Sequence, residues 1–416
     1  MKGIRVAFIG NLCGNAFFFC RALRERGVDA HLFLSSRELS PLETNANPGQ
    51  FGVDLGSESW VHVWDVRMQR RIAPPSTRLQ ERLRYVSSLP RLWQHLRAFD
   101  IVHAFTLTAI FVADSGRPFV VYPTGSDLAE TAISGGILGY LLRRAYRRAG
   151  RILLGTANRS KILGLDRAGV LGNTQMIPMG VEIPDLAEDK LCLPAQSSPE
   201  IRYFMPTRQD FADGTGAKRQ KGNDRFLKAL AVVRDEGLPV RATLLERGEH
   251  LGMAKRLIRD LELDANVRWL PSLTRTQLLS EFVRHDVVVD QFAVGNWGTT
   301  CIEAMSHGRP VMVHVLPEAA TSFSPSGIPV LNVCTQEQIA EMMRRAHSER
   351  EWLGRVGLDA RRYTVEYHGW DAVCSKVLEA YSEVLDGRPV PRLFDQDDWR
   401  RRGPVGQRSA TEWEEH

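Results

Sequence analysis

The sequence predicts an α/β protein made of two doubly wound domains that face each other across a cleft. Short apolar runs alternate with helical patterns along the chain, as in βαβ units and parallel sheets. The alternation stops in a Pro- and Ser-containing stretch at residues 185–200 and then begins again, so this stretch is interpreted as a linker. A length of 416 residues is also too great for one ordinary core.

In the first half, residues 1–190, we expect six strands with helices between them. The strands are Ile4–Ile9, His31–Leu34, Ile101–Ala104, Phe119–Tyr122, Ile152–Leu154 and Met176–Ile177. A helix over Asn15–Arg26 follows the first strand and ends before Gly27, a typical helix C-cap. Residues 40–60 read as a long loop, and residues 77–97 as a helix interrupted near Pro90.

The second domain is expected over residues 200–368. Its strands are Tyr203–Met205, Ala242–Leu245, Val267–Leu270, Val287–Val289 and Val311–Val315, and its helices are 223–235, 251–261, 274–284 and 299–307. Further helices are expected at 336–346, 349–362 and 370–385. The segment 369–386 is expected to cross back to the first domain, and 387–416 to form a mostly disordered tail.

Composition excludes several classes of protein. Hydrophobic residues make up 43% of the chain and charged residues 25%, which are globular values and exclude a disordered or fibrous chain. Six scattered cysteines, without a CxxC or a Cys/His cluster, argue against a disulfide scaffold and a structural zinc site. No apolar run reaches about 20 residues. The N-terminus is interpreted as a first strand rather than a signal peptide, so we expect a cytoplasmic protein.

The net charge of +5 is unevenly spread. Residues 1–190 hold 24 Lys+Arg against 17 Asp+Glu, whereas the remainder holds 30 against 32. A basic first half suits an anionic small molecule or a membrane surface as partner. The sequence shows no interleaved basic and aromatic residues, so we expect no nucleic-acid partner.

The segment around Gly298 is a candidate phosphate site. A buried-looking strand ends at Val289, a Gly-bearing loop follows, and a helix is expected to begin near Thr299. The first turn of a helix presents unpaired N–H groups and a positive dipole end, which suits a diphosphate. Thr300 adds a second hydroxyl, and Glu303, one turn on, could accept two hydroxyl hydrogens of a ribose. The alternative is that Gly298 only turns the chain and Glu303 lies on a solvated helix face.

Two cations are expected at the same rim of the second sheet. Arg208 follows the first strand of that domain, and Lys221 precedes its first long helix. Each charge-assisted hydrogen bond to a departing diphosphate contributes roughly 1.5–3 kcal/mol. The alternative is that both are ordinary surface charges, since the chain has 54 basic residues. The prediction therefore depends on Arg208, Lys221 and Thr299 coming together in space.

The order Arg208…Lys221-Gly…Glu303-Ala-Met-x-x-Gly-x-Pro-Val resembles the C-terminal domain of glycosyltransferase family 4, the group 1 nucleotide-sugar transferases of GT-B fold. In that fold, two Rossmann-like domains face each other across a cleft. Segments of the first half are similar to the family as well: the loop from Gly10 to Gly14, Asp100-Ile-Val-His103, Gly125-Ser-Asp127 and Ile177-Pro-Met-Gly180-Val-Glu. The resemblance covers roughly residues 4–385.

The resemblance implies roles for these residues. Arg208 and Lys221 would bind the donor diphosphate, and Glu303 would hold the donor ribose. The remaining donor contacts would be Gly298, Thr299 and Thr300 at the phosphates, Leu270 and Pro271 at the base, and Gly14 and Asn15 from the first domain. Transfer with retention, metal independence and no cofactor beyond the donor are also implied.

The chain departs from the family pattern in two places. The first Glu of Glu-x7-Glu would fall at position 295, where this chain has Gly295. The family's His-Gly-x-Asp is Thr124-Gly-Ser-Asp127 here. The chain therefore resembles a subgroup that lacks the first Glu. The residues expected to supply polar contacts to the sugar instead are Asp290, Gln291, Asn296 and Asp127.

On the acceptor side, Asp127 or His103 is the candidate polar group beside the acceptor hydroxyl, with Gly125 and Ser126 close by. Either could instead be structural, and a lone His at the end of a buried strand is more often a core residue. A membrane surface beside a lipid-linked acceptor is a further hypothesis, through Arg143, Arg144, Arg147 and Arg148. The alternative is the solvated basic face of a helix packed on its sheet, which the pattern favours.

We therefore expect an enzyme that moves a sugar from a nucleotide-sugar donor to a glycan, lipid-linked or small-molecule acceptor. It would act in polysaccharide, glycolipid or secondary-metabolite biosynthesis. A pseudo-glycosyltransferase and a catalytically silent nucleotide-sugar-binding protein remain as alternatives. A nicotinamide oxidoreductase needs GxGxxG after a strand, and the loop Gly10-Asn-Leu-Cys-Gly14 fails that spacing.

Overall fold

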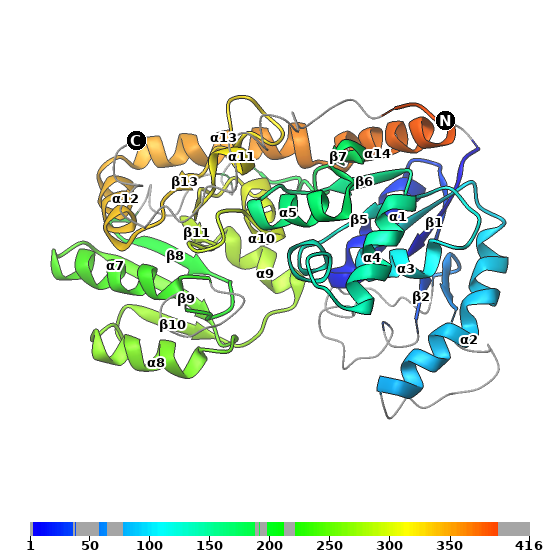
Figure 1. The fold of residues 1–416 in the computed structure, drawn as a ribbon. Coiled ribbons are helices and arrows are strands. Elements are labelled where there is room, and N and C mark those ends of the chain that lie inside the picture. The colour runs from blue at the N-terminus through cyan, green and yellow to red at the C-terminus, as the bar shows by residue number, and fades with distance from the viewer. Residues whose placement is uncertain are drawn as a thin grey trace.

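The computed structural model describes residues 3–35, 38, 58–64, 78–187, 191, 198–211 and 221–389. Figure 1 shows two α/β lobes side by side, one built from the blue and cyan half of the chain and one from the green and yellow half. Each lobe holds a sheet in which every pairing is parallel. The prediction of two doubly wound α/β domains is therefore confirmed.

The N-terminal sheet has the strand order β3-β2-β1-β4-β5-β6-β7. Its strands are β1 (Arg5–Ile9), β2 (Asp29–Leu34), β3 (Val61–Val63), β4 (Ile101–Phe105), β5 (Phe119–Tyr122), β6 (Arg151–Leu154) and β7 (Thr174–Met176). Strand β1 pairs with β2 on one side and with β4 on the other. The order reverses at this point, so the loop after β1 opens at the topological switch point, where ligands of such sheets bind.

Helices cover both faces of this sheet. They are α1 (Asn15–Glu25), α2 (Arg78–Leu96), α3 (Ala109–Val112), α4 (Ile137–Arg148) and α5 (Arg159–Ala168), with short turns η1 (Leu12–Gly14), η4 (Thr106–Thr108), η5 (Asp127–Thr131) and η6 (Leu171–Asn173). The expected interruption near Pro90 is wrong, because α2 runs through it. The expected loop at 40–60 lies outside the described residues except for 58–60.

The C-terminal sheet has the order β10-β9-β8-β11-β12-β13. Its strands are β8 (Ile201–Met205), β9 (Val240–Leu245), β10 (Val267–Leu270), β11 (Val287–Val289), β12 (Val311–Val313) and β13 (Leu331–Asn332). Its helices are α7 (Asn223–Asp235), α8 (Leu251–Asp260), α9 (Arg275–Phe282), α10 (Thr299–Ser306), α11 (Pro317–Ala320), α12 (Gln336–Ser348) and α13 (Arg350–His368). The central strands are almost wholly buried, as near-continuous Val, Ile and Leu runs predict.

The last helix, α14 (Trp370–Leu385), lies on the N-terminal domain (Figure 1). Its apolar face joins the cluster that contains Phe8 of β1 and Phe19 of α1. A buried ion pair between Arg151 and Glu383, at 2.9 Å, fixes its far end. The core of the first domain is therefore completed by the end of the described chain. Residues 390–416, most of the expected disordered tail, lie outside the described residues.

His103 belongs to this core, and the expectation that it stands beside an acceptor is corrected. Its ring is fully buried, and its Nδ1 lies 2.6 Å from the hydroxyl of Tyr381 on α14. The ring stacks on Phe8 and Phe105. Burial lowers the pKa of His103 to about 3, so the imidazole is neutral. A ring enclosed in this way cannot reach a substrate in the cleft.

The chain crosses between the lobes twice, and the two crossings are bonded to each other. The N–H of Val181 donates to the carbonyl of His368 at 2.9 Å, and Val181 forms an isolated parallel bridge with Gly369. The His368 Nδ1 lies 2.9 Å from the Met179 carbonyl. At Gly180 a Cβ would lie 2.2 Å from the ring of Trp370, so only glycine fits between the two crossings.

Candidate active site

Arg208 and Lys221 lie at the carboxyl-end rim of the second sheet, and Asp210 connects them. The Lys221 N–H donates to the Asp210 carbonyl at 2.7 Å, and the Arg208 guanidinium lies 3.2 Å from Asp210 Oδ2. The Asp210 side chain also accepts from the Glu249 N–H at 2.9 Å. This buried carboxylate therefore orders two loops and one cation at the rim.

The Lys221 ammonium donates to Gln291 Oε1 at the end of β11. The pKa of Lys221 is lowered, mainly by burial and further by the neighbouring charges of Arg208 and Arg247, while Asp290 and Asp210 oppose the shift. Arg208 and Lys221 are thus near enough to repel each other. Such repulsion is relieved by an anion placed between them.

Asp290 links these cations to the start of α10. Its Oδ2 accepts from the Gly298 N–H at 3.1 Å. Burial raises the pKa of Asp290, and the Lys221 charge opposes that shift. Gly298 is the N-cap of α10, and no side chain caps this helix in the part of the chain that the structure describes. Thr299 and Thr300, both half-buried, begin its first turn. The structure therefore brings Arg208, Lys221 and the α10 N-terminus to one rim.

Arg247, which the sequence analysis missed, is a third cation at this rim. It follows β9, and its guanidinium donates to the Pro206 carbonyl at 2.7 Å. Burial and the nearby Arg208 lower its pKa. Its position just after a strand of the same sheet is the signal that singled out Arg208, and it was available in the sequence.

Glu303 is buried in α10 and is paired with Arg275, so the solvated-face alternative is excluded. The Arg275 Nη1 lies 2.5 Å from Glu303 Oε1. Burial raises the pKa of Glu303, and the Arg275 charge opposes that shift. Sequence reasoning missed Arg275. A basic residue in the first turn of a helix opposes the helix dipole, which signals a partner outside its own helix.

The loop between β11 and α10 explains the missing carboxylate at position 295. Gly295 has φ +69°, and a Cβ there would lie 2.7 Å from Leu316. Gln291 Nε2 donates to the Asn296 carbonyl at 2.6 Å, and Asn296 Nδ2 reaches the Ala157 carbonyl of the N-terminal domain at 3.5 Å. Gln291 and Asn296 therefore fix the conformation of this loop, and Asn296 also bonds it to the N-terminal domain.

At the expected base site, the backbone of Leu270 and Pro271 has few free hydrogen-bonding groups for a base. The Leu270 carbonyl already accepts from the Glu246 N–H at 2.8 Å. Pro271 is exposed and has no N–H to donate. A base edge could meet the second lone pair of the Leu270 carbonyl, but it cannot receive a hydrogen bond from the next residue.

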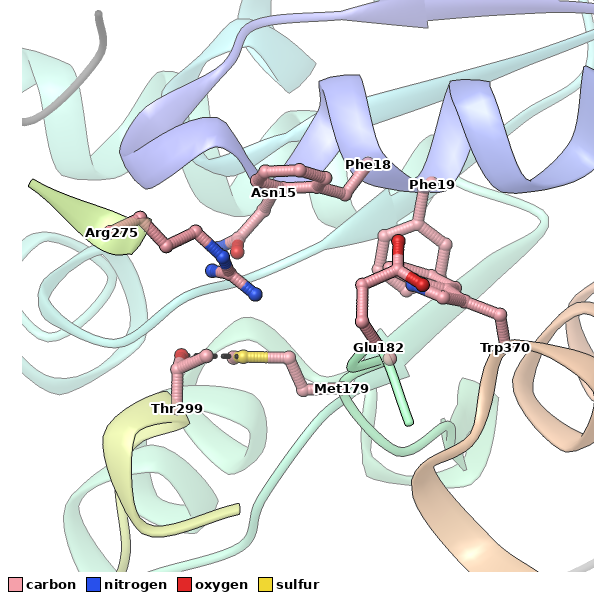
Figure 2. Close-up of a pocket in the computed structure, with 9 residues that line it drawn as sticks. Asn15, Phe18, Phe19, Met179, Glu182, Arg275, Thr299 and Trp370 are labelled. Carbon is pink, nitrogen blue, oxygen red and sulfur yellow. Dashed lines mark hydrogen bonds between the residues drawn. The ribbon is translucent and has the colours of Figure 1, made fainter. Parts of the chain in front are cut away.

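The N-terminal domain meets this rim at the start of α1. Gly14, with φ +75°, precedes the helix, and Asn15 is its first residue. Figure 2 shows Asn15, Phe18 and Arg275 around one pocket, with Thr299 donating to the sulfur of Met179 at 2.7 Å across the lobes. Water has about 20 Å³ of room in this pocket, enough for about one molecule. The lobes are therefore nearly closed at this point.

Asp127 stabilises the loop that holds Gly125 and Ser126, which was expected on the acceptor side. Its Oδ1 accepts from the Gly125 N–H at 2.8 Å and its Oδ2 from the Tyr146 hydroxyl at 3.0 Å. Burial raises its pKa, with the Lys161 charge opposing the shift. Burial also lowers the pKa of Lys161 to about 8. Of the three residues expected here, Ser126 is the exposed one, so Asp127 shapes the loop while Ser126 faces solvent.

The four arginines of α4 are engaged with the protein itself. Arg144 and Arg148 both pair with Asp114, at 2.8 and 2.7 Å. Arg143 donates to the Ala132 and Ser134 carbonyls, and Arg147 reaches the Ala168 carbonyl at 3.4 Å. The side chains that α4 exposes most at its beginning are instead apolar or aromatic: Ile137, Leu138 and Tyr140.

None of the helices described is both long and apolar enough to cross a bilayer. Across the same residues, no group of three or more His, Cys, Asp or Glu side chains is placed to hold a metal ion.

Family models match a segment of each lobe. Residues 216–360 match the family model described as glycosyl transferases group 1, and residues 19–158 match the glycosyl transferase 4-like domain. The chain belongs to the group 1 glycosyltransferases. In this group 1 glycosyltransferase, the segment 216–360 contains Lys221, Arg247 and the whole of α10 with Glu303. Arg208 lies before this segment.

Individual relatives place this glycosyltransferase among enzymes of GT-B architecture. It is 24% identical over 308 residues to an MMP α-(1→4)-mannosyltransferase of Mycolicibacterium hassiacum, covering 69% of this chain and 71% of that one. The fold resembles Anabaena HepE in complex with UDP, with TM-score 0.66, 15% identity and coverage of 91% and 100%. It also resembles sucrose-phosphate synthase of Thermosynechococcus elongatus, with TM-score 0.61, 14% identity and coverage of 92% and 100%.

Proposed function

We propose that this enzyme transfers a glycosyl group, with retention, from a nucleoside-diphosphate sugar to an acceptor hydroxyl. The observation that carries the proposal is the cluster of Arg208, Lys221 and Arg247 beside the uncapped start of α10. A nucleoside diphosphate gains negative charge as it leaves the sugar. Fixed cations and a helix N-terminus stabilise that charge more in the transition state than in the ground state.

The other donor contacts follow from their places around this cluster. Thr299 and Thr300 offer hydroxyls to the phosphates. Glu303 accepts hydroxyl hydrogens of the ribose once the Arg275 guanidinium moves away from it. Gly14 and Asn15 approach from the N-terminal domain. Gln291 and Asn296 act through the loop that they hold, as positioning residues. The base lies beside Leu270 and Pro271, where the second lone pair of the Leu270 carbonyl is left to accept a hydrogen bond from it.

The acceptor binds on the N-terminal side, near Gly125 and Ser126. Asp127 keeps this loop in place and is assigned a positioning role, because both its oxygens accept hydrogen bonds from within the domain. The departing diphosphate is the base that receives the acceptor proton in a retaining transfer of this kind, so no strong protein base is required there. Closure of the lobes keeps water from competing with the acceptor.

A panel of UDP, GDP and ADP tests the donor site by thermal stabilisation. A ligand at one hundred times its dissociation constant stabilises a protein by about 2.7 kcal/mol. Lys221→Ala should remove the shift. Lys228→Ala, on the exposed side of α7, the helix that follows Lys221, should retain the shift. Stabilisation by NAD, with no response to the three diphosphates, would contradict the proposal and favour a nicotinamide oxidoreductase.

Transfer must be measured separately from binding, because Gly295 and Thr124 replace family side chains that touch the sugar. Release of nucleoside diphosphate from a panel of nucleotide sugars, in the presence of glycan, lipid-linked and small-molecule acceptors, reports transfer. Tight binding without turnover on any acceptor would favour the silent binding protein. Joining of a non-sugar group would favour the pseudo-glycosyltransferase.

Contact with an anionic membrane is a separate proposal for α4. Arg143, Arg144, Arg147 and Arg148 bond within the protein, so the exposed Ile137 and Tyr140 would provide the apolar part of the contact. Sedimentation with anionic vesicles tests this. Replacing the four arginines by Gln should weaken binding through charge, and Ile137→Ser with Tyr140→Ser should weaken it through lost apolar burial. Unchanged sedimentation in both variants would refute the contact.

A further inference from the structure

A hollow lies at the amino ends of the strands of the C-terminal sheet, opposite to the rim that holds Lys221. It has about 340 Å³ of room for water, which is within the range of sites that hold a small molecule. Its lining comes from the amino ends of β8, β9 and β10 and from residues 281–285, between α9 and β11. We call it the arginine hollow, after the four arginines that line it: Arg202, Arg241, Arg268 and Arg284.

Three neighbouring strands each carry an arginine of the hollow as their second residue: Arg202 in β8, Arg241 in β9 and Arg268 in β10. Side chains alternate between the two faces of a sheet, so these arginines share the face that packs against α9 and α10. Arg202 and Arg241 are partners in the strand register. Because neighbouring strands lie only about 4.8 Å apart, such like charges repel each other.

The carboxylates in the hollow offset only part of this positive charge. Glu200 pairs with both Arg202 and Arg241, at 3.2 Å in each case. Glu281 pairs with Arg284 at 2.7 Å. The lining therefore holds four arginines and two glutamates, and two positive charges remain without a compensating carboxylate.

The hollow also holds hydrogen-bond donors that have no partner. Arg202 and Arg241 bond to Glu200 through Nε alone, so their terminal nitrogens make no hydrogen bond to any described residue. Within the same part of the chain, Arg268 makes neither an ion pair nor a hydrogen bond. Its charge and that of Arg202 nevertheless act on His285, whose pKa is lowered mainly by burial, so this imidazole is neutral and adds no charge.

We propose that the arginine hollow is a second anion site, which binds the phosphate group of a soluble phosphorylated small molecule. A phosphomonoester carries a charge of about −1.5 to −2 at neutral pH, which matches the two uncompensated charges, whereas a carboxylate matches one. Its oxygens accept hydrogen bonds from the planar N–H forks of arginine. A flat anionic membrane fits less well, because it would bring further negative charge toward Glu200 and Glu281.

Calorimetric titration with inorganic phosphate and with glycerol 3-phosphate tests the site. Phosphate can also bind at the donor rim, so the titrations are made in Lys221→Ala, where we expect one phosphate site to remain. In that background, Arg241→Gln with Arg268→Gln should weaken binding roughly tenfold or more, the loss expected when charge-assisted hydrogen bonds are removed. Arg256→Gln is the control, since Arg256 is exposed on α8 and lies outside the hollow; its phosphate affinity should be unchanged.

Thermal unfolding separates an anion site from a structural cluster of arginines. In phosphate-free buffer, Arg268→Gln should unfold at the same temperature as the wild type or at a higher one, because it removes uncompensated charge. Added phosphate should stabilise Lys221→Ala but not the variant that also lacks Arg241 and Arg268. A lower unfolding temperature of Arg268→Gln, together with unchanged phosphate affinity, would overturn the site in favour of a structural role.

Two further results would overturn the proposal. One is the absence of phosphate binding in Lys221→Ala, which would leave the donor rim as the place where phosphate binds. The other is sedimentation with vesicles that contain phosphatidic acid, without binding of either soluble phosphate, which would assign the arginines to a lipid surface. The inference does not depend on the proposed function, because failure of nucleoside diphosphates to bind at Lys221 would leave the hollow and its charge unchanged.

Discussion

The two lobes share one architecture, but they differ in the charge that they place at the carboxyl ends of their strands. The C-terminal rim gathers Arg208, Lys221 and Arg247 around buried acids. At the same edge of the N-terminal sheet, Gly14 and Asn15 present backbone and amide groups. There the charged groups turn inward, as Asp127 does.

Under the proposed function, the C-terminal lobe stabilises the leaving group and the N-terminal lobe selects the acceptor. Placing several charges close together in a protein costs free energy, and it lowers a barrier only where a reaction develops opposite charge. A nucleoside diphosphate leaving group develops such charge, and an acceptor hydroxyl develops little. The same βαβ scaffold therefore carries either task, depending on the side chains that follow its strands.

The largest effect is expected at Lys221. Lys221→Met should lower the transfer rate by roughly 10²–10³-fold, the loss typical when a group that stabilises developing charge is removed. Lys228→Met, on the helix that follows Lys221 and paired with Asp224, is the matched control and should transfer at the wild-type rate. Steady-state rates with saturating acceptor check this. A transfer rate of Lys221→Met within fivefold of the wild-type rate would contradict the proposed difference between the lobes.

The N-terminal lobe should be sensitive to acid because its interior holds a neutral imidazole. The pKa of His103 is about 3 in the folded chain and 6.5 as its ordinary value. Between these values the unfolded chain binds more protons, so stability rises with pH and is lost as the pH falls below 6.5. At pH 5 the loss from this group is about 2 kcal/mol.

Urea unfolding at pH 7 and pH 5 measures this loss. His103→Phe should be less stable at pH 7, because the Tyr381 hydroxyl loses its partner, but should lose less stability on acidification. An equal acid loss in the wild type and in the variant would assign the sensitivity to other groups. His368, whose pKa burial lowers to about 4, is the first of these to test.

A smaller effect is expected from restoring the family carboxylate. Gly295→Glu should reduce stability by about 1–3 kcal/mol, because a side chain at φ +69° is strained and its Cβ meets Leu316. We expect no gain in transfer from this single change. The double variant Gly295→Glu with Leu316→Ala provides room, so a gain there alone would show that Leu316 is what excludes the carboxylate. Thermal unfolding and transfer rates report the two effects.

The smallest effect is expected on the N-terminal side of the pocket. Asn15→Ala should lower the transfer rate by about three- to tenfold, the cost of one uncharged hydrogen bond. Its affinity for nucleoside diphosphate should change less than that of Lys221→Met. Ser160→Ala, on the exposed face of α5, serves as the control. If Asn15→Ala instead abolished diphosphate binding, the donor would depend on both lobes equally.

Much of the fold could be predicted because the periodic apolar pattern follows local geometry. The expected helices 223–235 and 370–385 have the observed bounds, and strands such as Val267–Leu270 match as well. Strands β3 and β13 were missed. Strand β3 has three residues, all only partly buried, and gives too little alternation to detect.

The site was predictable only to the extent that chain position determines it. Arg208 and Lys221 were found because residues that follow parallel strands share one rim. The partner of Arg275 lies 28 positions away on another helix, and nothing in the local pattern specifies that pair. His103 was misplaced because it lies in the middle of β4 rather than at its end, and the sequence pattern did not show that α14 would cover it.

Helix α14 makes the first domain depend on a segment that is synthesised after the second domain. Its residues from Trp370 to Tyr381 fill the hollow against α1 and β1. A ribosome must therefore translate the whole second domain before the first can mature. Until that moment the nascent first domain exposes an apolar groove that needs protection. A premature stop within α14 should therefore damage the N-terminal domain although every residue of its sheet has already been made.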